Sequence, residues 1–217
     1  MTAMSTVDIF NRYALDYDEW YRRHELVAMA EVRAVSMVRP EGFGIEVGVG
    51  SGFFAKNLGI PLGLEPALAM ARLARDRGVM VVSGMGELMP IRDSSLDYVV
   101  MIVTICFLDD PRNTLREVRR VLKPGGRLVT CIVPRDSAHG RFYRELGGRG
   151  HRFYSAAHFY RVGEVVEMLR SLGFVVDDRA VATLSRGVGD YYEEPRIVSL
   201  GEAENYGFVC VTAHILK

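Results

Sequence analysis

Two acidic residues and three glycines lie close together in the first third of the chain. Glu46 closes a short apolar run, Gly48, Gly50 and Gly52 follow at alternate positions, and Glu65 ends the next apolar run. Glycines in this pattern let the backbone turn tightly after a strand and approach a ligand where a Cβ would collide. A carboxylate at the tip of the second strand can accept hydrogen bonds from both hydroxyls of a ribose. The pattern predicts a site for a nucleotide-like ligand.

The spacing of these glycines differs from that of a dinucleotide-binding loop. Such a loop has the pattern G-x-G-x-x-G, whose third glycine allows close packing of helix on strand. Here the third glycine comes one position earlier, and Phe53 stands where the pattern has glycine. Glycine turns are common in α/β proteins, so a purely structural turn remains an alternative for the loop taken alone.

The elements around this loop alternate between strands and helices. Apolar runs at 79–84 and 94–103 predict strands, and the second is apolar almost throughout, as in a strand buried on both faces. Asp110-Pro111 predicts the start of a helix, which stops at Pro124-Gly125-Gly126, and a further strand follows at 127–133. This alternation predicts a doubly wound, mostly parallel sheet.

The order of these motifs resembles that of the class I S-adenosylmethionine-dependent methyltransferases. Residues 46–52 resemble the family's first motif, E/D-x-G-x-G-x-G, and residues 116–126 resemble its helix-turn-strand signature. The resemblance covers residues 43–133 and is closest to the small single-domain group (methyltransferase type 11) that includes the ubiquinone, menaquinone and sterol methyltransferases. It implies a Rossmann-like α/β fold, with a seven-stranded, mostly parallel sheet and an antiparallel last strand, and S-adenosyl-L-methionine as the cofactor.

The resemblance also implies which residues bind the cofactor. The glycine loop and Glu46 would lie under its amino-acid end, and Glu65 would bind the ribose; the alternative is that Glu65 only caps a helix beginning at Pro66. Met85 stands where the family often has Asp, so backbone groups there would pair with the adenine. Glu87 either contacts the ligand or is only a surface or helix-start residue. The expected cofactor-binding residues are Glu46, Gly48, Val49, Gly50, Gly52, Glu65, Pro66, Met85, Gly86, Glu87, Ile102 and Val103.

Two segments beside this core are expected to recognise the acceptor. The aromatic residues of 10–21 recur at helical spacing and resemble an entry helix that covers the cofactor, unless they only pack on the domain. The segment 135–161 combines six arginines, two acids and many aromatic residues, which suits an anionic, partly apolar small molecule or else a solvated helix face. The expected substrate-binding residues are Tyr13, Tyr17, Trp20, Thr104, Cys106, Arg141 and Tyr154.

Methyl transfer from a sulfonium needs few catalytic side chains, because alignment of donor and acceptor supplies most of the acceleration. A general base is needed only if the acceptor atom carries a proton, and the candidates are Tyr17, Tyr154 and His158. Cys106 is expected to be a buried thiol rather than a nucleophile, since no base is tied to it. The histidines lack the spacing of a metal site, so no metal is expected.

Composition limits the remaining possibilities. The 217 residues predict one domain, with a helical cover at 1–40, a cofactor-binding core at 41–133, a substrate cap at 134–161 and a C-terminal helix and strand hairpin at 162–217. The 27 basic and 27 acidic side chains balance, which argues against a nucleic-acid partner. The chain lacks an apolar run long enough for a membrane span, and we expect a cytoplasmic location.

The three cysteines, Cys106, Cys131 and Cys210, are widely spaced and lie in apolar surroundings. An odd number of such residues predicts buried thiols in a reducing compartment, without a disulfide.

The sequence thus predicts methyl transfer from S-adenosyl-L-methionine to a small-molecule acceptor by a monomer or homodimer. A protein or RNA methyltransferase of the same fold is one alternative, and a non-catalytic module that binds the cofactor is another. A nicotinamide oxidoreductase is less favoured because of Phe53 and the glycine spacing.

Overall fold

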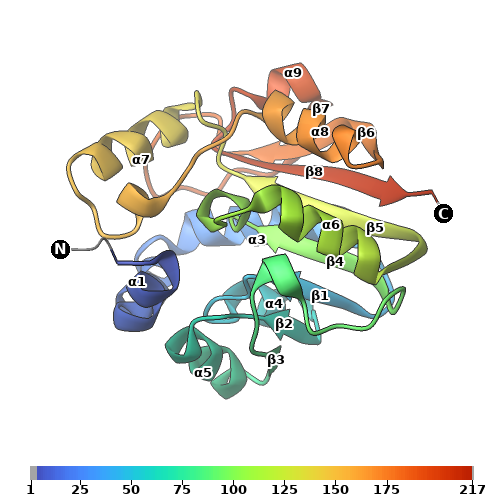
Figure 1. Ribbon diagram of the computed structural model, residues 1–217. Helices are drawn as coiled ribbons and strands as arrows, with labels where there is room; N and C mark the ends of the chain where they lie inside the picture. The colour runs from blue at the N-terminus through green and yellow to red at the C-terminus, as the bar shows by residue number, and fades with distance from the viewer. Residues whose placement is uncertain (1–3, 217) are drawn as a thin grey trace.

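A single twisted sheet forms the centre of the molecule (Figure 1). The computed structural model describes residues 4–216, and within them eight strands follow the order β3-β2-β1-β4-β5-β8-β6-β7. Strands β1 to β5 pair in parallel, β8 runs antiparallel to β5 and β6, and β7 runs antiparallel to β6. The strands are β1 Gly44–Val47, β2 Leu62–Leu64, β3 Met80–Val82, β4 Leu96–Ile102, β5 Leu122–Ile132, β6 Phe174–Thr183, β7 Arg196–Ser199 and β8 Phe208–Ile215.

This sheet confirms the expected doubly wound α/β class, with one difference in the number of strands. The sequence predicts seven, and the eighth is β7, a strand of four residues at the sheet edge. Ile197 in this strand is 57% exposed, and only Val198 of the four is buried. Such a short and mostly exposed edge strand leaves little apolar pattern in the sequence.

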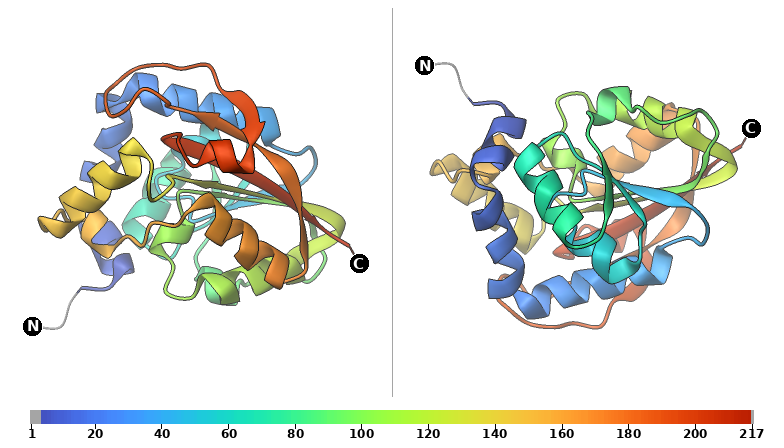
Figure 2. Two further views of the ribbon diagram at one scale, coloured as in Figure 1. Left: turned by 90° about the horizontal axis from the view of Figure 1, so that it is seen from above. Right: turned by 90° about the horizontal axis from the view of Figure 1, so that it is seen from below.

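Helices cover both faces of the sheet (Figure 2). Helices α3 (Glu25–Val38) and α4 (Phe53–Leu58) lie on one face, and α6 (Pro111–Val121) and α8 (Val162–Ser171) lie on the other. Asp110 is the N-cap of α6, as expected, because its carboxylate accepts a hydrogen bond from the main-chain nitrogen of Asn113 (2.9 Å).

The two layers divide the side chains of the central strand β4 between them. Val99 and Met101 pack in the core on the α6 side, whereas Tyr98, Val100 and Ile102 pack on the α3 side. Successive residues of a strand point to opposite faces, so a strand covered on both faces is apolar at almost every position. This is the physical origin of the uninterrupted apolar run in the sequence.

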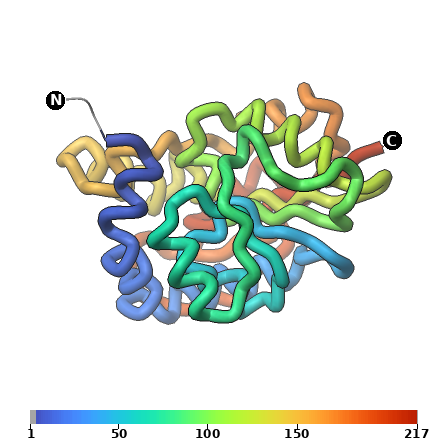
Figure 3. The backbone as a smooth tube through the Cα atoms, turned by 60° about the horizontal axis from the view of Figure 1, so that its bottom comes forward, coloured from blue at the N-terminus to red at the C-terminus, as the bar shows by residue number. Residues whose placement is uncertain are grey.

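The remaining helices gather mainly at the carboxyl ends of the parallel strands (Figure 3). The N-terminal pair α1 and α2 lies beside α5 and α7, and both helices contribute residues to the cavity at the glycine loop. No helix within residues 4–216 has the length and apolar character to cross a membrane. The further elements are α1 Thr6–Arg12, α2 Ala14–Arg23, α5 Leu68–Asp76, η1 Gly86–Leu88, η2 Ile105–Phe107, α7 Ala138–Gly148, η3 Tyr154–Ala156 and α9 Leu200–Ala203.

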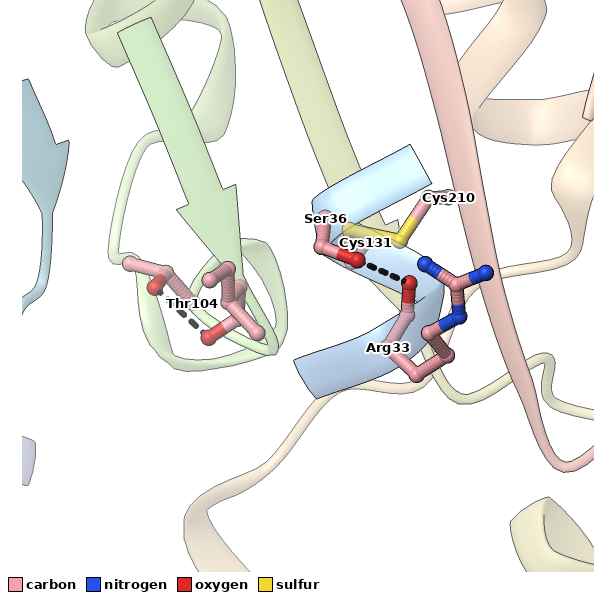
Figure 4. The surroundings of a disulfide bond; sticks show 6 residues. Arg33, Ser36, Thr104, Cys131 and Cys210 are labelled. Atoms are coloured by element: carbon pink, nitrogen blue, oxygen red, sulfur yellow. Dashed lines mark hydrogen bonds between the residues drawn. A yellow bond between two sulfur atoms is a disulfide. The ribbon is translucent and has the colours of Figure 1, made fainter. Parts of the chain in front are cut away.

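A disulfide joins β5 to β8, which corrects one expectation (Figure 4). Cys131 and Cys210 are register partners in the antiparallel pair, with Cα atoms 4.0 Å apart. The prediction of free thiols at these two positions was therefore wrong. The residues lie 79 apart in sequence, so only the strand pairing brings them together. Cys106 is a free, buried thiol, as expected.

Candidate functional site

The glycine loop between β1 and α4 has a left-handed backbone at its three glycines. The φ angles are +71° at Gly48, +54° at Gly50 and +79° at Gly52, a region that other residues rarely adopt. A Cβ at Gly48 would lie 2.4 Å from the Thr104 side chain, whereas a Cβ at Gly50 would meet nothing within 4 Å. Gly50 therefore borders open space where a ligand can approach the main chain.

Glu65, at the end of β2, is fixed against this loop by the main chain. Its Oε2 accepts a hydrogen bond from the Gly50 nitrogen (2.9 Å), and its Oε1 accepts one from the Ala67 nitrogen (2.9 Å). Burial raises the pKa of Glu65, and the two hydrogen bonds oppose that rise. Helix α5 begins at Leu68 with Ala67 as its N-cap residue, so the alternative that Glu65 caps this helix is wrong.

Glu46, in β1, is a buried carboxylate with an unsatisfied oxygen. The residue is 1% exposed, and its Oε2 has no hydrogen-bond partner among the described residues. Burial is the main cause that raises the pKa of Glu46 well above its usual value, and the nearby charge of Glu65 adds to the rise. An unpartnered buried carboxylate is costly, so a ligand group that donates hydrogen bonds would complete this site.

A cavity of about 110 Å³ opens in front of the glycine loop, and we call it the loop cavity. Its walls come from the ends of β1, β2 and β4, from η1 and from α1. Gly52 is the one expected cofactor-binding residue that does not line it, because Gly52 turns into α4, where a Cβ would lie 2.9 Å from the Ala74 Cα. The expected residues that line it are Glu46, Gly48, Val49, Gly50, Glu65, Pro66, Met85, Gly86, Glu87, Ile102 and Val103.

The far end of the loop cavity contains a second unsatisfied carboxylate oxygen. Oε1 of Glu87 accepts a hydrogen bond from the Asp110 nitrogen (3.3 Å), whereas its Oε2 is buried without a partner in the described chain. The main-chain oxygen of Glu87 accepts a bond from the Asn113 side chain (2.7 Å), which holds η1 against α6. Met85 lines the same end and is 39% exposed. Glu87 thus offers a hydrogen-bond acceptor to an amino group of a ligand, whereas the Met85 side chain offers none.

The N-terminal helices are tied down over the loop cavity. Asn11 of α1 accepts a hydrogen bond from the Ala69 nitrogen in the first turn of α5 (3.0 Å). Arg77, at the end of α5, donates to Asp18 of α2 (2.7 Å) and to the Ser51 carbonyl of the glycine loop (2.7 Å). The lid expected from the aromatic stripe therefore contacts both the loop and the helix that follows Glu65.

A second and larger cavity, of about 500 Å³, adjoins the first, and we call it the aromatic cavity. The two share part of their walls: Tyr17, Tyr21, Phe54, Ile102, Val103 and Phe107. Helices α2 and α3 form one side, and α7 with the segment around η3 forms the other. The remaining lining residues are Asp16, Trp20, Arg23, His24, Glu31, Cys106, Val133, Tyr143, His151, Arg152, Phe153, Tyr154 and Phe159.

Four of the expected substrate-binding residues, Tyr17, Trp20, Cys106 and Tyr154, line the aromatic cavity. Thr104 lines the loop cavity instead, and its hydroxyl donates to the Val47 carbonyl (3.0 Å). Burial raises the pKa of the Cys106 thiol to about 12, so this thiol stays protonated and is a poor nucleophile.

Three expected residues lie outside both cavities: Tyr13, Arg141 and His158. Arg141 is exposed on α7 and donates to the carbonyl of Asp136, which turns it away from the cavity wall. His158 packs its ring against Tyr160, and Tyr13 packs against Phe153 under the Arg152 guanidinium. The structure therefore does not support the roles expected for these three side chains.

The two candidate bases that do line the cavity are phenols in a buried setting. Burial raises the pKa of Tyr17 and of Tyr154 above the usual tyrosine value. Both side chains keep their protons near neutral pH and are suited to donate hydrogen bonds rather than to accept a proton.

Glu31, which was not among the expected site residues, lines the aromatic cavity from α3 and is 6% exposed. The available signal was a single acid within the apolar stretch 27–32 of a helix. Tyr143 and Phe159 were also missed as lining residues, since only the folding of 134–161 places them opposite α3.

Comparisons with known proteins identify the relatives of this chain. Residues 45–130 match the model of a family described as "Methyltransferase domain". The chain is 33% identical to an uncharacterized protein of Methanocaldococcus jannaschii over 95% of this chain and 98% of that protein. It is also 33% identical to the demethylmenaquinone methyltransferase of Corynebacterium kroppenstedtii, over 39% of this chain and 37% of that enzyme.

A crystal structure from Thermotoga maritima has a TM-score of 0.89 and 37% identity, and it covers 96% of this chain and 99% of its own. That protein is described as an S-adenosylmethionine-dependent methyltransferase and a possible histamine N-methyltransferase.

The chain belongs to the class I S-adenosylmethionine-dependent methyltransferases, on the evidence of its fold, its glycine loop and these relatives. Its cofactor is S-adenosyl-L-methionine.

Proposed function

We propose that this enzyme transfers a methyl group from S-adenosyl-L-methionine, bound in the loop cavity, to a small molecule bound in the aromatic cavity. The observation that carries the proposal is the wall shared by the two cavities. Ile102 and Val103, at the end of β4, line both of them, together with Tyr17 and Tyr21 of the lid. A donor and an acceptor in these cavities would meet at this wall.

The residues of the loop cavity offer hydrogen-bond partners to each part of the cofactor, which supports the proposal. Glu46 offers an unpartnered carboxylate oxygen for the ammonium of the amino-acid part, and Gly50 leaves the main chain accessible. Glu65 is placed for the ribose hydroxyls, and Glu87 offers its free oxygen to the adenine amino group. When bound, the cofactor supplies a methyl carbon activated by a positively charged sulfur, for in-line displacement by the acceptor.

The protein's own part is to orient the acceptor and exclude water. The aromatic cavity is walled mainly by rings. The lid is held over the loop cavity by the hydrogen bond that Asn11 accepts from the Ala69 nitrogen and by the one that Arg77 donates to Asp18. Alignment of two reactants is worth roughly 7–11 kcal/mol of activation free energy, which exceeds the contribution of a single acid–base residue. Alignment is therefore the main contribution of this chain, and a base is needed only where the acceptor atom carries a proton.

A small molecule is favoured over a macromolecule as the acceptor. A volume of about 500 Å³ suits a ligand of modest size. The balanced charge of the chain gives no general attraction for nucleic acid. The description of the Thermotoga maritima relative, which names histamine, is consistent with a small acceptor here.

Calorimetric titration with S-adenosylmethionine, S-adenosylhomocysteine and NAD tests the cofactor. We expect micromolar binding of the two adenosyl ligands and none of NAD. Glu65→Ala should lose that binding, whereas Glu167→Ala, an exposed carboxylate of α8, should keep it. Binding of NAD alone would overturn the proposal, and tight cofactor binding without methyl transfer to any small acceptor would favour a non-catalytic module.

A further inference from the structure

Glu31 is a buried acid that the proposed chemistry leaves without a role. It lies in the middle of α3, between the buried residues Ala30 and Val32, and its side chain lines the aromatic cavity. Burial alone raises its pKa, to about 8, because no cation or hydrogen-bond donor of the described chain offsets it. A carboxylate that is only 6% exposed and has no partner is costly to the fold. The cost points to a ligand that supplies the missing partner.

Aromatic side chains surround this carboxylate. Tyr17 and Tyr21 of α2 and Tyr143 and Tyr154 of the opposite wall are close enough that the charge of Glu31 contributes, after burial, to the rise in their pKa values. Trp20 completes the ring of aromatic walls. Faces of aromatic rings carry negative potential and attract organic cations.

The two arginines that line the aromatic cavity do not pair with Glu31. Arg152 is paired with Asp16, lies 4.6 Å from the Tyr13 ring centroid, and its side chain is 48% exposed. Arg23 has a side chain that is 71% exposed and lies 3.5 Å from Glu19. Both guanidinium groups lie at the solvent side and already face acids, so neither of them is the partner of the buried acid Glu31.

We propose that the acceptor is a small organic amine, whose ammonium group binds the Glu31 carboxylate while its apolar body packs against the surrounding rings. The ammonium gives its proton to Glu31 before methyl transfer, which frees the nitrogen lone pair to attack the methyl carbon and leaves Glu31 protonated. The inference rests on the proposed function, because it takes the aromatic cavity as the acceptor site. It replaces the anionic acceptor expected from the arginines of 135–161. Five of those six arginines are exposed, and Arg135, which is half-buried, pairs with Glu164 (3.1 Å), whereas the buried acid that lines the cavity is Glu31.

The test uses the fluorescence of Trp20, the single tryptophan of the sequence, which lines the cavity. The protein, with and without S-adenosylhomocysteine, is titrated with butylamine and 2-phenylethylamine. The matched ligands are 1-butanol, 2-phenylethanol and 3-phenylpropionate. We expect the amines to bind about 30-fold more tightly than the alcohols, and the carboxylate not to bind, because only the amines pair with a buried charge.

Glu31→Gln should remove the preference for amines and leave the weak binding of alcohols unchanged, with Glu25→Gln, an exposed acid of the same helix, as the control. Equal binding of amines and alcohols, tighter binding of the carboxylate, or no binding of either amine would overturn the inference. The wild-type comparison alone decides the matter if the variant does not fold. Failure of cofactor binding in the calorimetric experiment, with the amine preference intact, would instead overturn the proposed function.

Discussion

The two adjoining cavities are built in different ways. The loop cavity is formed by strand ends and glycine turns, and its ribose acid, Glu65, is held by two main-chain nitrogens. The aromatic cavity is formed by side chains from helices distant in sequence, and its acid, Glu31, is held by nothing in the described chain. The first cavity is fixed by the backbone that this fold requires. The second depends on side chains that can change while the fold remains.

The largest effect should come from closing the loop cavity at Gly50. Gly50→Val places a side chain in the open space beside the loop, so cofactor binding should be abolished in calorimetry. Gly59→Val is the matched control, because Gly59 also has positive φ (+66°) and open space around its Cβ but lies outside both cavities. Both variants should lose about 1–2 kcal/mol of stability from the left-handed backbone. Equal cofactor affinity in the two variants would remove the loop cavity as the cofactor site.

The unpartnered acid of the aromatic cavity should make the fold less stable as pH rises. The pKa of Glu31 is near 8 in the fold and near the ordinary value in the unfolded chain, so the folded state binds the extra proton between these values. Stability is therefore lost as pH rises from 5 to 8, and Glu31→Gln should recover roughly 3 kcal/mol of it over that range. The other ionisable groups that line this cavity are present in both proteins, so their contributions cancel in the comparison: Asp16, Tyr17, Tyr21, Arg23, His24, Tyr143, His151, Arg152 and Tyr154.

Urea unfolding of both proteins at pH 5 and pH 8 measures this difference. A stability gain in Glu31→Gln that is the same at both pH values would show that the wild-type carboxylate is not desolvated, and the contrast between the two acids would disappear.

A smaller difference in amine binding is expected between a variant of a residue that lines the aromatic cavity and a variant of a residue that lies outside it. Tyr154→Phe removes a hydroxyl that lines the cavity near Glu31 and can accept a hydrogen bond from the amine, so amine binding should weaken about fivefold in the Trp20 titration. Arg141→Ala should change it less than twofold, since Arg141 is exposed and lies outside the cavity. A larger loss in Arg141→Ala than in Tyr154→Phe would return the acceptor site to the arginine-rich segment.

Reduction of the disulfide is expected to have the smallest effect on ligand binding in either cavity, because the disulfide joins β5 and β8 within the sheet. Denatured protein without reductant should show one alkylated cysteine, Cys106, by mass spectrometry, and reduced protein should show all three. Reduction should leave the affinities for cofactor and amine within about twofold, because Cys131 and Cys210 line neither cavity. Three reactive cysteines before reduction would contradict the disulfide.

The same contrast explains what the sequence could predict. The order of strands and helices, the Asp110 cap and the residues of the loop cavity follow from local patterns, because glycines at fixed spacing and apolar runs act through the backbone. Glu31, Tyr143 and the Cys131–Cys210 pair depend on contacts between distant segments, which no local pattern records. Arg141 was expected at the acceptor because charge along 135–161 was counted without knowing which side chains point inward.

A structure of the protein with S-adenosylhomocysteine and 2-phenylethylamine tests the central claim most directly. The account predicts the ribose at Glu65, in the loop cavity, and the amine nitrogen within hydrogen-bond distance of Glu31, in the aromatic cavity. An adenosyl group bound elsewhere, or an amine whose nitrogen faces away from Glu31, would contradict it.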